Sequence, residues 1–110
     1  MGDCRSLPSL TYYAKRNTIQ SFRCKHTQSL FEGGDPSRFR AFKDTAIRKL
    51  TQLEAAQTLE FLRSPPGNQL EALKGNRKGQ YSIRISSQFR LCFIWTNNGP
   101  TDVEIVDYYP

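Results

Sequence analysis

Residues 80–109 read QYSIRISSQFRLCFIWTNNGPTDVEIVDYY, and this stretch decides the fold. It contains three runs rich in β-branched and aromatic residues, at 80–86, 89–95 and 102–109, and such residues favour strands. The turn-forming TNNGPT at 96–101 separates the last two runs. The sequence therefore predicts a β-meander at this end of the chain.

Alternation within these runs assigns the two faces of the predicted sheet, because successive side chains of a strand point to opposite sides. The core face is predicted to carry large apolar side chains, namely Tyr81, Ile83, Ile85, Phe89, Leu91, Phe93 and Trp95. The opposite face is predicted to carry Ser82, Arg84, Arg90 and Cys92. Arginine in a strand otherwise free of charge is either an ordinary solvent-facing residue or a functional one.

The sequence upstream of the meander predicts one strand followed by helices. Residues 18–24, TIQSFRC, predict a strand, and 26–34, HTQSLFEGG, predict a short helix closed by its glycines. Asp35 is a suitable N-cap and Pro36 suits the first helical position. One long amphipathic helix ending near residue 56 is therefore predicted, and its apolar stripe is Phe39, Phe42, Ala46, Leu50 and Leu53.

This order of elements predicts an α+β fold, with N-terminal helices packed on one face of a mainly antiparallel sheet of about four or five strands. Residues 18–110 are expected to form one domain. Residues 1–17 lack periodicity and are predicted to be an irregular extension whose deletion leaves the fold intact. The sequence lacks an apolar run of the roughly 20 residues that span a bilayer, and it lacks a recognisable secretory signal. A cytoplasmic protein without membrane contact is therefore expected.

Charge and cysteine content narrow the classes of partner and cofactor. Sixteen Lys and Arg against ten Asp and Glu give a net charge of +6, which suits polyphosphate partners. The cysteines Cys4, Cys24 and Cys92 are odd in number, form no C-x-x-C pair and have only His26 as a companion ligand. No metal site, disulfide framework or cofactor is therefore expected, and Cys24 and Cys92 are interpreted as buried, reduced residues.

A cluster of positive charge precedes the meander and continues into it. The segment 73–79, LKGNRKG, places three bases in a loop flanked by glycines, where cationic side chains can approach a phosphodiester. Between Glu71 and Arg90 the single acid is outnumbered by five bases, Lys74, Arg77, Lys78, Arg84 and Arg90. Basic loops also occur on ordinary soluble surfaces, so the cluster alone does not assign a function.

The order and spacing of these pieces are more specific. The motif SPPGN-x-LEAL-x-GNR-x-GQ-x-SIR at 64–84 is followed by R-x-CF-x-W at 90–95 and EIVDY at 104–108. Over about residues 18–109 the sequence resembles HigB-type members of the RelE/ParE toxin superfamily. The resemblance implies a toxin of a type II toxin-antitoxin system that cleaves mRNA on the ribosome, by attack of the RNA 2′-hydroxyl on the adjacent phosphate. It also implies a helix-turn-helix antitoxin of the HigA type and a toxin-antitoxin hetero-oligomer.

The resemblance also implies roles for individual residues. Lys74 matches the lysine of the family's L-x-x-LKG loop, and Arg77 and Arg90 match its basic positions, so all three are expected to contact phosphate. Asp107 begins a D-Y-His signature that here ends in Tyr109. The candidate catalytic residues are Glu71, Lys74, Arg77, Arg90, Asp107 and Tyr109, and the candidate RNA contacts are Lys78, Arg84 and Tyr108.

Two questions stay open at this point. Relatives carry histidine where this chain has Tyr109, and some carry it at Glu71, so the general base here is a carboxylate, Glu71 or Asp107, or a tyrosine or lysine of lowered pKa. Glu71 is equally interpreted as a structural partner of a nearby base. Because one fold serves several functions, a ParE-like protein that binds DNA gyrase without nuclease chemistry is the alternative function. A degenerate toxin that only binds its antitoxin is a third reading.

Overall fold

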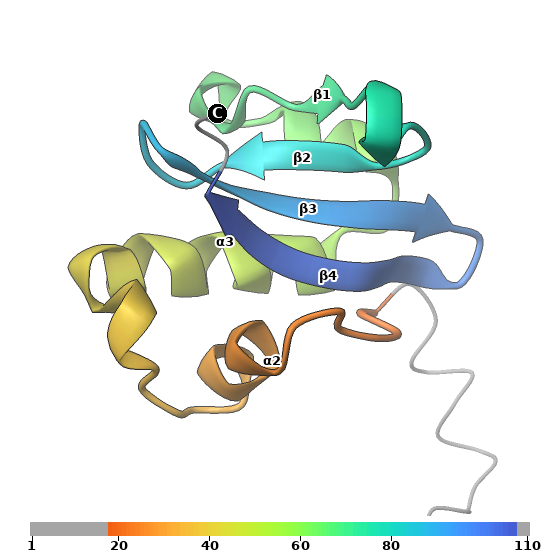
Figure 1. The fold of residues 1–110 in the computed structure, drawn as a ribbon. Helices are drawn as coiled ribbons and strands as arrows, with labels where there is room; N and C mark the ends of the chain where they lie inside the picture. Colours follow the sequence, from red (N-terminus) through yellow and green to blue (C-terminus); the bar gives the residue numbers. More distant parts are fainter. Residues whose placement is uncertain (1–17, 108–110) are drawn as a thin grey trace, which may run out of the picture.

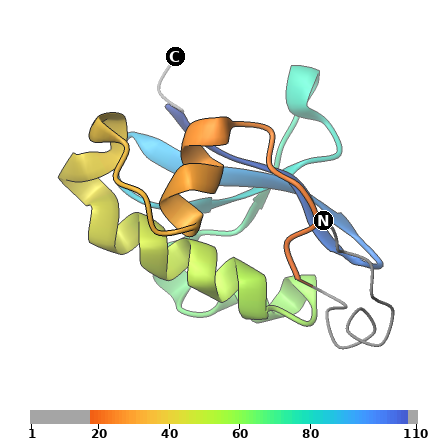
Figure 2. The ribbon, with the colours of Figure 1, turned by 90° about the horizontal axis from the view of Figure 1, so that it is seen from below.

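The computed structural model describes residues 18–107, in which short helices precede a four-stranded sheet (Figure 1). Helix α3 (Lys43–Ala55) lies against one face of the sheet, and helix α2 (Lys25–Phe31) lies beside the last strand (Figure 1 and Figure 2). Both leave the opposite face of the sheet open. Within this part of the chain, no helix is long and apolar enough to cross a membrane.

The sheet is an antiparallel meander whose strands neighbour one another in sequence order. Its strands are β1 (Glu71–Ala72), β2 (Tyr81–Arg84), β3 (Phe89–Thr96) and β4 (Gly99–Asp107). A two-residue turn at Asn97 and Asn98 joins β3 to β4, and Gly99 follows it with a φ of 124°, a conformation that glycine adopts without strain. The predicted α+β fold and mainly antiparallel sheet are confirmed.

The predicted faces of the strands are also confirmed. Ile83, Leu91 and Phe93 are fully buried in the core between the sheet and α3, together with Leu50 and Leu53 from the helix. The pairing register places Ser82 beside Cys92 and Arg84 beside Arg90 on the other face. The alternation of apolar and polar residues was sufficient to predict the faces, because a shift of the strand register by one residue would turn every core side chain toward water.

The prediction of a strand at 18–24 is wrong in detail. This segment forms one isolated parallel bridge, between Phe22 and Val103, and the chain then turns into α2. The Arg23 amide donates to the Val103 carbonyl at 3.0 Å, and the Ile105 amide of β4 donates to Thr27 Oγ1 at 3.0 Å. A side chain of α2 thus replaces a strand partner, so the segment and α2 together protect the outer edge of β4.

The prediction of one long helix from Asp35 is also corrected. The 3₁₀ helix η2 (Ser37–Phe42) comes first, and α3 begins only at Lys43. Asp35 caps no helix. Its carboxylate instead pairs with Lys43 at 3.3 Å and Arg40 at 3.2 Å, and the hydrogen bond from Lys43 is the main cause that lowers its pKa. The tighter 3₁₀ turns place Phe39 in the core. The ring centroids of Phe42 and Phe89 are 4.5 Å apart. Helical periodicity does not reveal this contact between two distant segments.

A buried asparagine fixes the chain where it leaves the helices for the sheet. Two 3₁₀ turns, η3 (Leu59–Arg63) and η4 (Pro66–Asn68), lead there, and Asn68 is fully buried. Its amide nitrogen donates to the Leu62 carbonyl at 3.0 Å and to Gln52 Oε1 at 3.1 Å, while its oxygen accepts from Lys49. Burial lowers the pKa of Lys49. The asparagine of the SPPGN motif is therefore structural, since it anchors the approach to β1 on α3.

Candidate functional site

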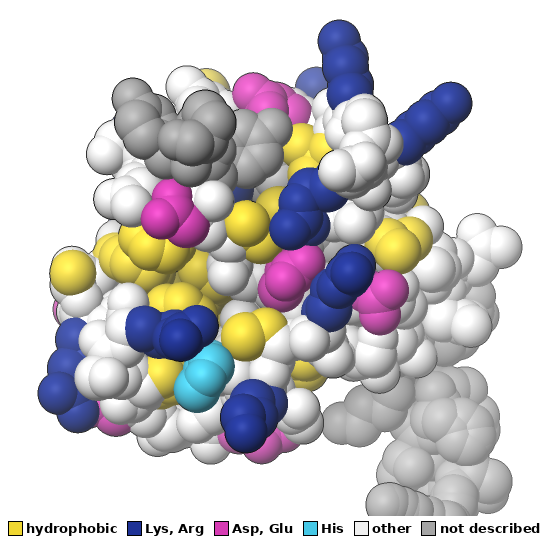
Figure 3. Space-filling model, viewed as in Figure 1, with side chains coloured by type: hydrophobic (Ala, Val, Ile, Leu, Met, Phe, Trp, Pro, Cys, Tyr) yellow, Lys and Arg dark blue, Asp and Glu magenta, His cyan; other side chains and the backbone are white. Residues whose placement is uncertain are grey.

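The face of the sheet opposite α3, called the open face below, carries polar side chains from all four strands. Pairing sets Glu71 opposite Ser82, Ser82 opposite Cys92, and Cys92 opposite Glu104, so these four residues form one row across the sheet. Basic and acidic side chains lie close together over this face (Figure 3). Ser82 and Cys92, in the middle of this row, are fully buried, so a polar ligand can reach the row only at its two ends, the exposed Glu71 and the partly buried Glu104.

The basic loop lies at the β1 edge of this face. It contains the 3₁₀ turn η5 (Gly75–Arg77), and Gly75 and Gly79 have φ values of 62° and 95°, which other residues adopt only with strain. Lys74 and Lys78 are exposed. Glu71 and Lys74 line one hollow of about 490 Å³, so the structure brings these two predicted site residues together.

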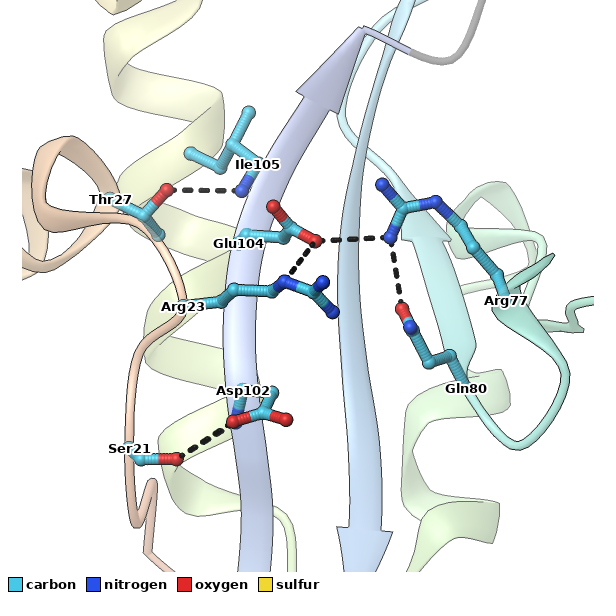
Figure 4. A network of polar contacts seen from close by, with 8 residues as sticks. All are labelled: Ser21, Arg23, Thr27, Arg77, Gln80, Asp102, Glu104 and Ile105. Carbon is cyan, nitrogen blue, oxygen red and sulfur yellow. Dashed lines mark hydrogen bonds and ion pairs between the residues drawn. The ribbon is translucent and has the colours of Figure 1, made fainter.

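Arg77 reaches from the loop across the open face to β4 (Figure 4). Its Nη1 donates to Gln80 Oε1 and to Glu104 Oε2, each at 3.0 Å. The same oxygen of Glu104 lies 3.9 Å from Nε of Arg23. Arg77 is therefore held by a neutral and an acidic acceptor on the face where a phosphate contact was predicted.

Arg90 lies on the predicted face but is almost entirely buried, with 7% of its surface exposed. Its Nε donates to Ser82 Oγ at 2.7 Å, and one Nη donates to the carbonyls of Gln69 and Ser82. Arg84, opposite it in the register, is more exposed and donates to the Ser86 carbonyl at 3.3 Å. The guanidinium of Arg90 thus links its own strand, β3, to β2 and to the segment before β1. The contact predicted between Arg90 and a phosphate remains a prediction.

Asp107 is not brought to the open face. It pairs with Phe89 in the register and shares its side of β4 with the core residue Ile105. It lines a separate hollow with Arg38, Phe39 and Phe89 on the side of the helices, and its carboxylate accepts from Gln88 at 2.9 Å. Tyr108 and Tyr109 lie outside the described residues.

The cysteines within residues 18–107 are both free thiols. Cys92 is fully buried, and burial raises the pKa of its thiol to about 11. The interpretation of Cys92 as a buried residue is confirmed. Cys24 is only half-buried. A thiol with so high a pKa stays protonated at neutral pH, so Cys92 supplies no nucleophile to the face on which it lies.

Comparison with known proteins gives the family. A family model described as the RelE-like toxin of the type II toxin-antitoxin system HigB matches residues 20–109. The toxin HigB-1 of Vibrio cholerae serotype O1 is 41% identical over 80 residues, which are 69% of this chain and 82% of the relative. This chain belongs to the HigB toxin family. An uncharacterized protein of Haemophilus influenzae is 43% identical over 51 residues, 46% of this chain and 50% of that protein.

Membership in a toxin-antitoxin family implies that this HigB-family toxin has an antitoxin partner. Three polar residues of its open face were not singled out from the sequence, namely Arg23, Gln80 and Glu104. Strand alternation could have placed Glu104 on the face of Arg90, because both residues lie in recognisable strands. Arg23 could not be found in this way, because no local pattern indicates that the segment before α2 contacts β4.

The burial of Arg90 in the HigB-family fold leads to a prediction about stability. Arg90→Ala is expected to lower the free energy of unfolding by about 2 to 4 kcal/mol, because the Ser82 and Gln69 acceptors lose their buried donor. Thermal denaturation should show a melting temperature lower by roughly 10 to 20 °C. Arg84→Ala is the matched control, and its expected cost is under about 1 kcal/mol. An Arg90→Ala protein that melts with the parent would contradict a structural role for this guanidinium.

Proposed function

We propose that this HigB-family toxin is an endoribonuclease that cleaves mRNA on the ribosome. The observation that carries the proposal is that Glu71 and Lys74 line one hollow at the β1 edge of the sheet, while Arg77 extends from the next loop to Glu104 of β4. The net charge of +6 suits a polyanionic substrate. Family membership supports the same reaction class, since RelE-like HigB toxins are generally endoribonucleases.

The proposed reaction uses the 2′-hydroxyl of the RNA as its nucleophile. Glu71 accepts the proton of that hydroxyl as its oxygen attacks the adjacent phosphorus, and the bond to the departing 5′-oxygen breaks as that oxygen takes a proton from solvent water. Lys74, which lines the hollow with Glu71, stabilises the additional negative charge on the phosphate oxygens, which is where a fixed cation has most effect. The upstream product then ends in a 2′,3′-cyclic phosphate, and the downstream product begins with a 5′-hydroxyl.

The proposal extends to the partners of the toxin. The ribosome and its mRNA are the substrate complex, which places the protein in the cytoplasm. The antitoxin is proposed to be a HigA-like helix-turn-helix protein that forms a hetero-oligomer with the toxin. Residues 18–110 are proposed to be sufficient for these activities, with 1–17 dispensable.

A paired assay tests the proposal against gyrase binding. Brief induction of the toxin should give discrete mRNA breaks in primer extension, while gyrase supercoiling in the presence of the purified toxin continues at its normal rate. End-group analysis should find the cyclic phosphate, and added EDTA should not prevent cleavage at concentrations that leave the ribosome intact. Inhibited supercoiling with intact mRNA would instead indicate a ParE-like function. Intact mRNA and normal supercoiling, with antitoxin still bound, would indicate a degenerate toxin.

A further inference from the structure

Three charged side chains from distant parts of the chain meet on the open face (Figure 4). Arg23 precedes α2, Arg77 belongs to the loop between β1 and β2, and Glu104 lies in the middle of β4. Glu104 Oε2 lies 3.0 Å from Arg77 Nη1 and 3.9 Å from Arg23 Nε. A single carboxylate oxygen thus lies next to two guanidinium groups.

The surroundings of Glu104 suit a positioning role. Its side chain is 16% exposed, against 32% for Arg77 and 57% for Arg23. The acid is therefore fixed within the face while both cations extend outward from it. Without this carboxylate, two like charges on long, flexible side chains would repel each other and spread over several rotamers.

Both arginines keep donors for a ligand. Of the nitrogens of Arg77, only Nη1 donates to a described residue, and Arg23 approaches Glu104 through Nε. A guanidinium binds phosphate best through two parallel N–H groups, and the remaining nitrogens can supply such pairs. The cluster around Glu104 lies away from Glu71, the proposed general base. Glu71 and Glu104 stand at opposite ends of the row across the sheet, three strand spacings or roughly 14 Å apart.

We propose that Arg23 and Arg77, set side by side by Glu104, bind a backbone phosphate of the RNA that flanks the scissile one. This inference rests on the proposed function, because it assumes an RNA substrate. Arg23 is then a binding residue, and Glu104 is a positioning residue that acts through the two arginines.

Charge dependence of binding tests the role of Arg23. The probe is a fluorescent single-stranded RNA oligonucleotide with 2′-O-methyl groups, which the toxin cannot cleave, and its Kd is measured by anisotropy over a series of salt concentrations. Arg23→Ala should weaken binding and reduce the slope of log Kd against log salt by about one. Arg63→Ala is the matched control, because Arg63 is 62% exposed and pairs with Glu60, and it should leave the slope at the parental value. Equal slopes for the two variants would overturn the inference.

The kinetics of Glu104 variants separate positioning from acid-base chemistry. In cleavage of mRNA on programmed ribosomes, Glu104→Ala should lower kcat/KM by about 10- to 100-fold, the effect of a misplaced cation. Glu104→Gln should recover much of this loss, because its amide oxygen still accepts from Arg77. If Gln and Ala were equally inactive, Glu104 would act as a base rather than as a positioning residue, and if both were fully active the inference would fail.

A parent that neither cleaves mRNA nor binds the oligonucleotide would overturn the proposed function itself, together with this site. The parent and the Glu104→Gln variant should have the same melting temperature, which shows that a difference in rate is not caused by unfolding.

Discussion

A single 2′-deoxynucleotide immediately 5′ to the scissile phosphate is expected to abolish cleavage at that bond. The substitution removes only the attacking oxygen, while every phosphate charge seen by Lys74 and Arg77 is unchanged. An intramolecular nucleophile is worth an effective molarity of about 100,000 M or more, and a water molecule in the same site does not replace that advantage. The rate should therefore fall below detection, while the affinity for the message stays within about twofold.

The measurement is gel analysis of a message labelled at one end and bound to the ribosome in the reading frame that the toxin cleaves. Messages with the deoxy substitution one or two nucleotides away are the controls, and these should be cut at the normal position. Cleavage of the substituted message at the same bond would exclude the 2′-hydroxyl route. The roles proposed for Glu71 and Lys74 in this reaction would then be withdrawn.

The sheet was predictable from sequence because its information is local. Alternation within 80–109 predicted the strands β2, β3 and β4, and it placed Phe93 in the core and Arg90 on the other face, as the structure confirms. The helical half was harder to predict. The break at Phe42 coincides with a ring contact to Phe89, 47 positions later in the chain, and helical periodicity does not encode such a contact.

Only part of the arrangement of the candidate residues could be predicted from the sequence. The basic loop and Glu71 lie together on one face because β1 and β2 are adjacent in sequence and in the sheet. The burial of Arg90 and the approach of Arg23 to Glu104 depend on contacts across the whole fold. Charge and spacing identify which residues are candidates, and tertiary packing decides whether a guanidinium meets a ligand or the protein's own carbonyl groups.

The sequence left Glu71 and Asp107 as equal candidates for the general base, and their positions in the structure distinguish them. Glu71 lies on the open face and lines a hollow with Lys74, whereas Asp107 lies on the side of the helices beside Phe89. A general base must come within hydrogen-bond reach of the hydroxyl that it deprotonates, so the open face favours Glu71.

Glu71→Gln is accordingly expected to lower kcat for mRNA cleavage by roughly 100- to 10,000-fold, because glutamine keeps the shape of the side chain but cannot accept the proton. Its KM should change little, since the exposed Glu71 side chain contributes no positive charge to RNA binding. Asp107→Asn is the matched control and should retain activity within about tenfold, because its amide can still accept from Gln88. Single-turnover cleavage on programmed ribosomes measures both variants. The reverse order of effects would place the proton transfer at the end of β4, and would mean that bound RNA passes around the edge of the sheet rather than across its open face.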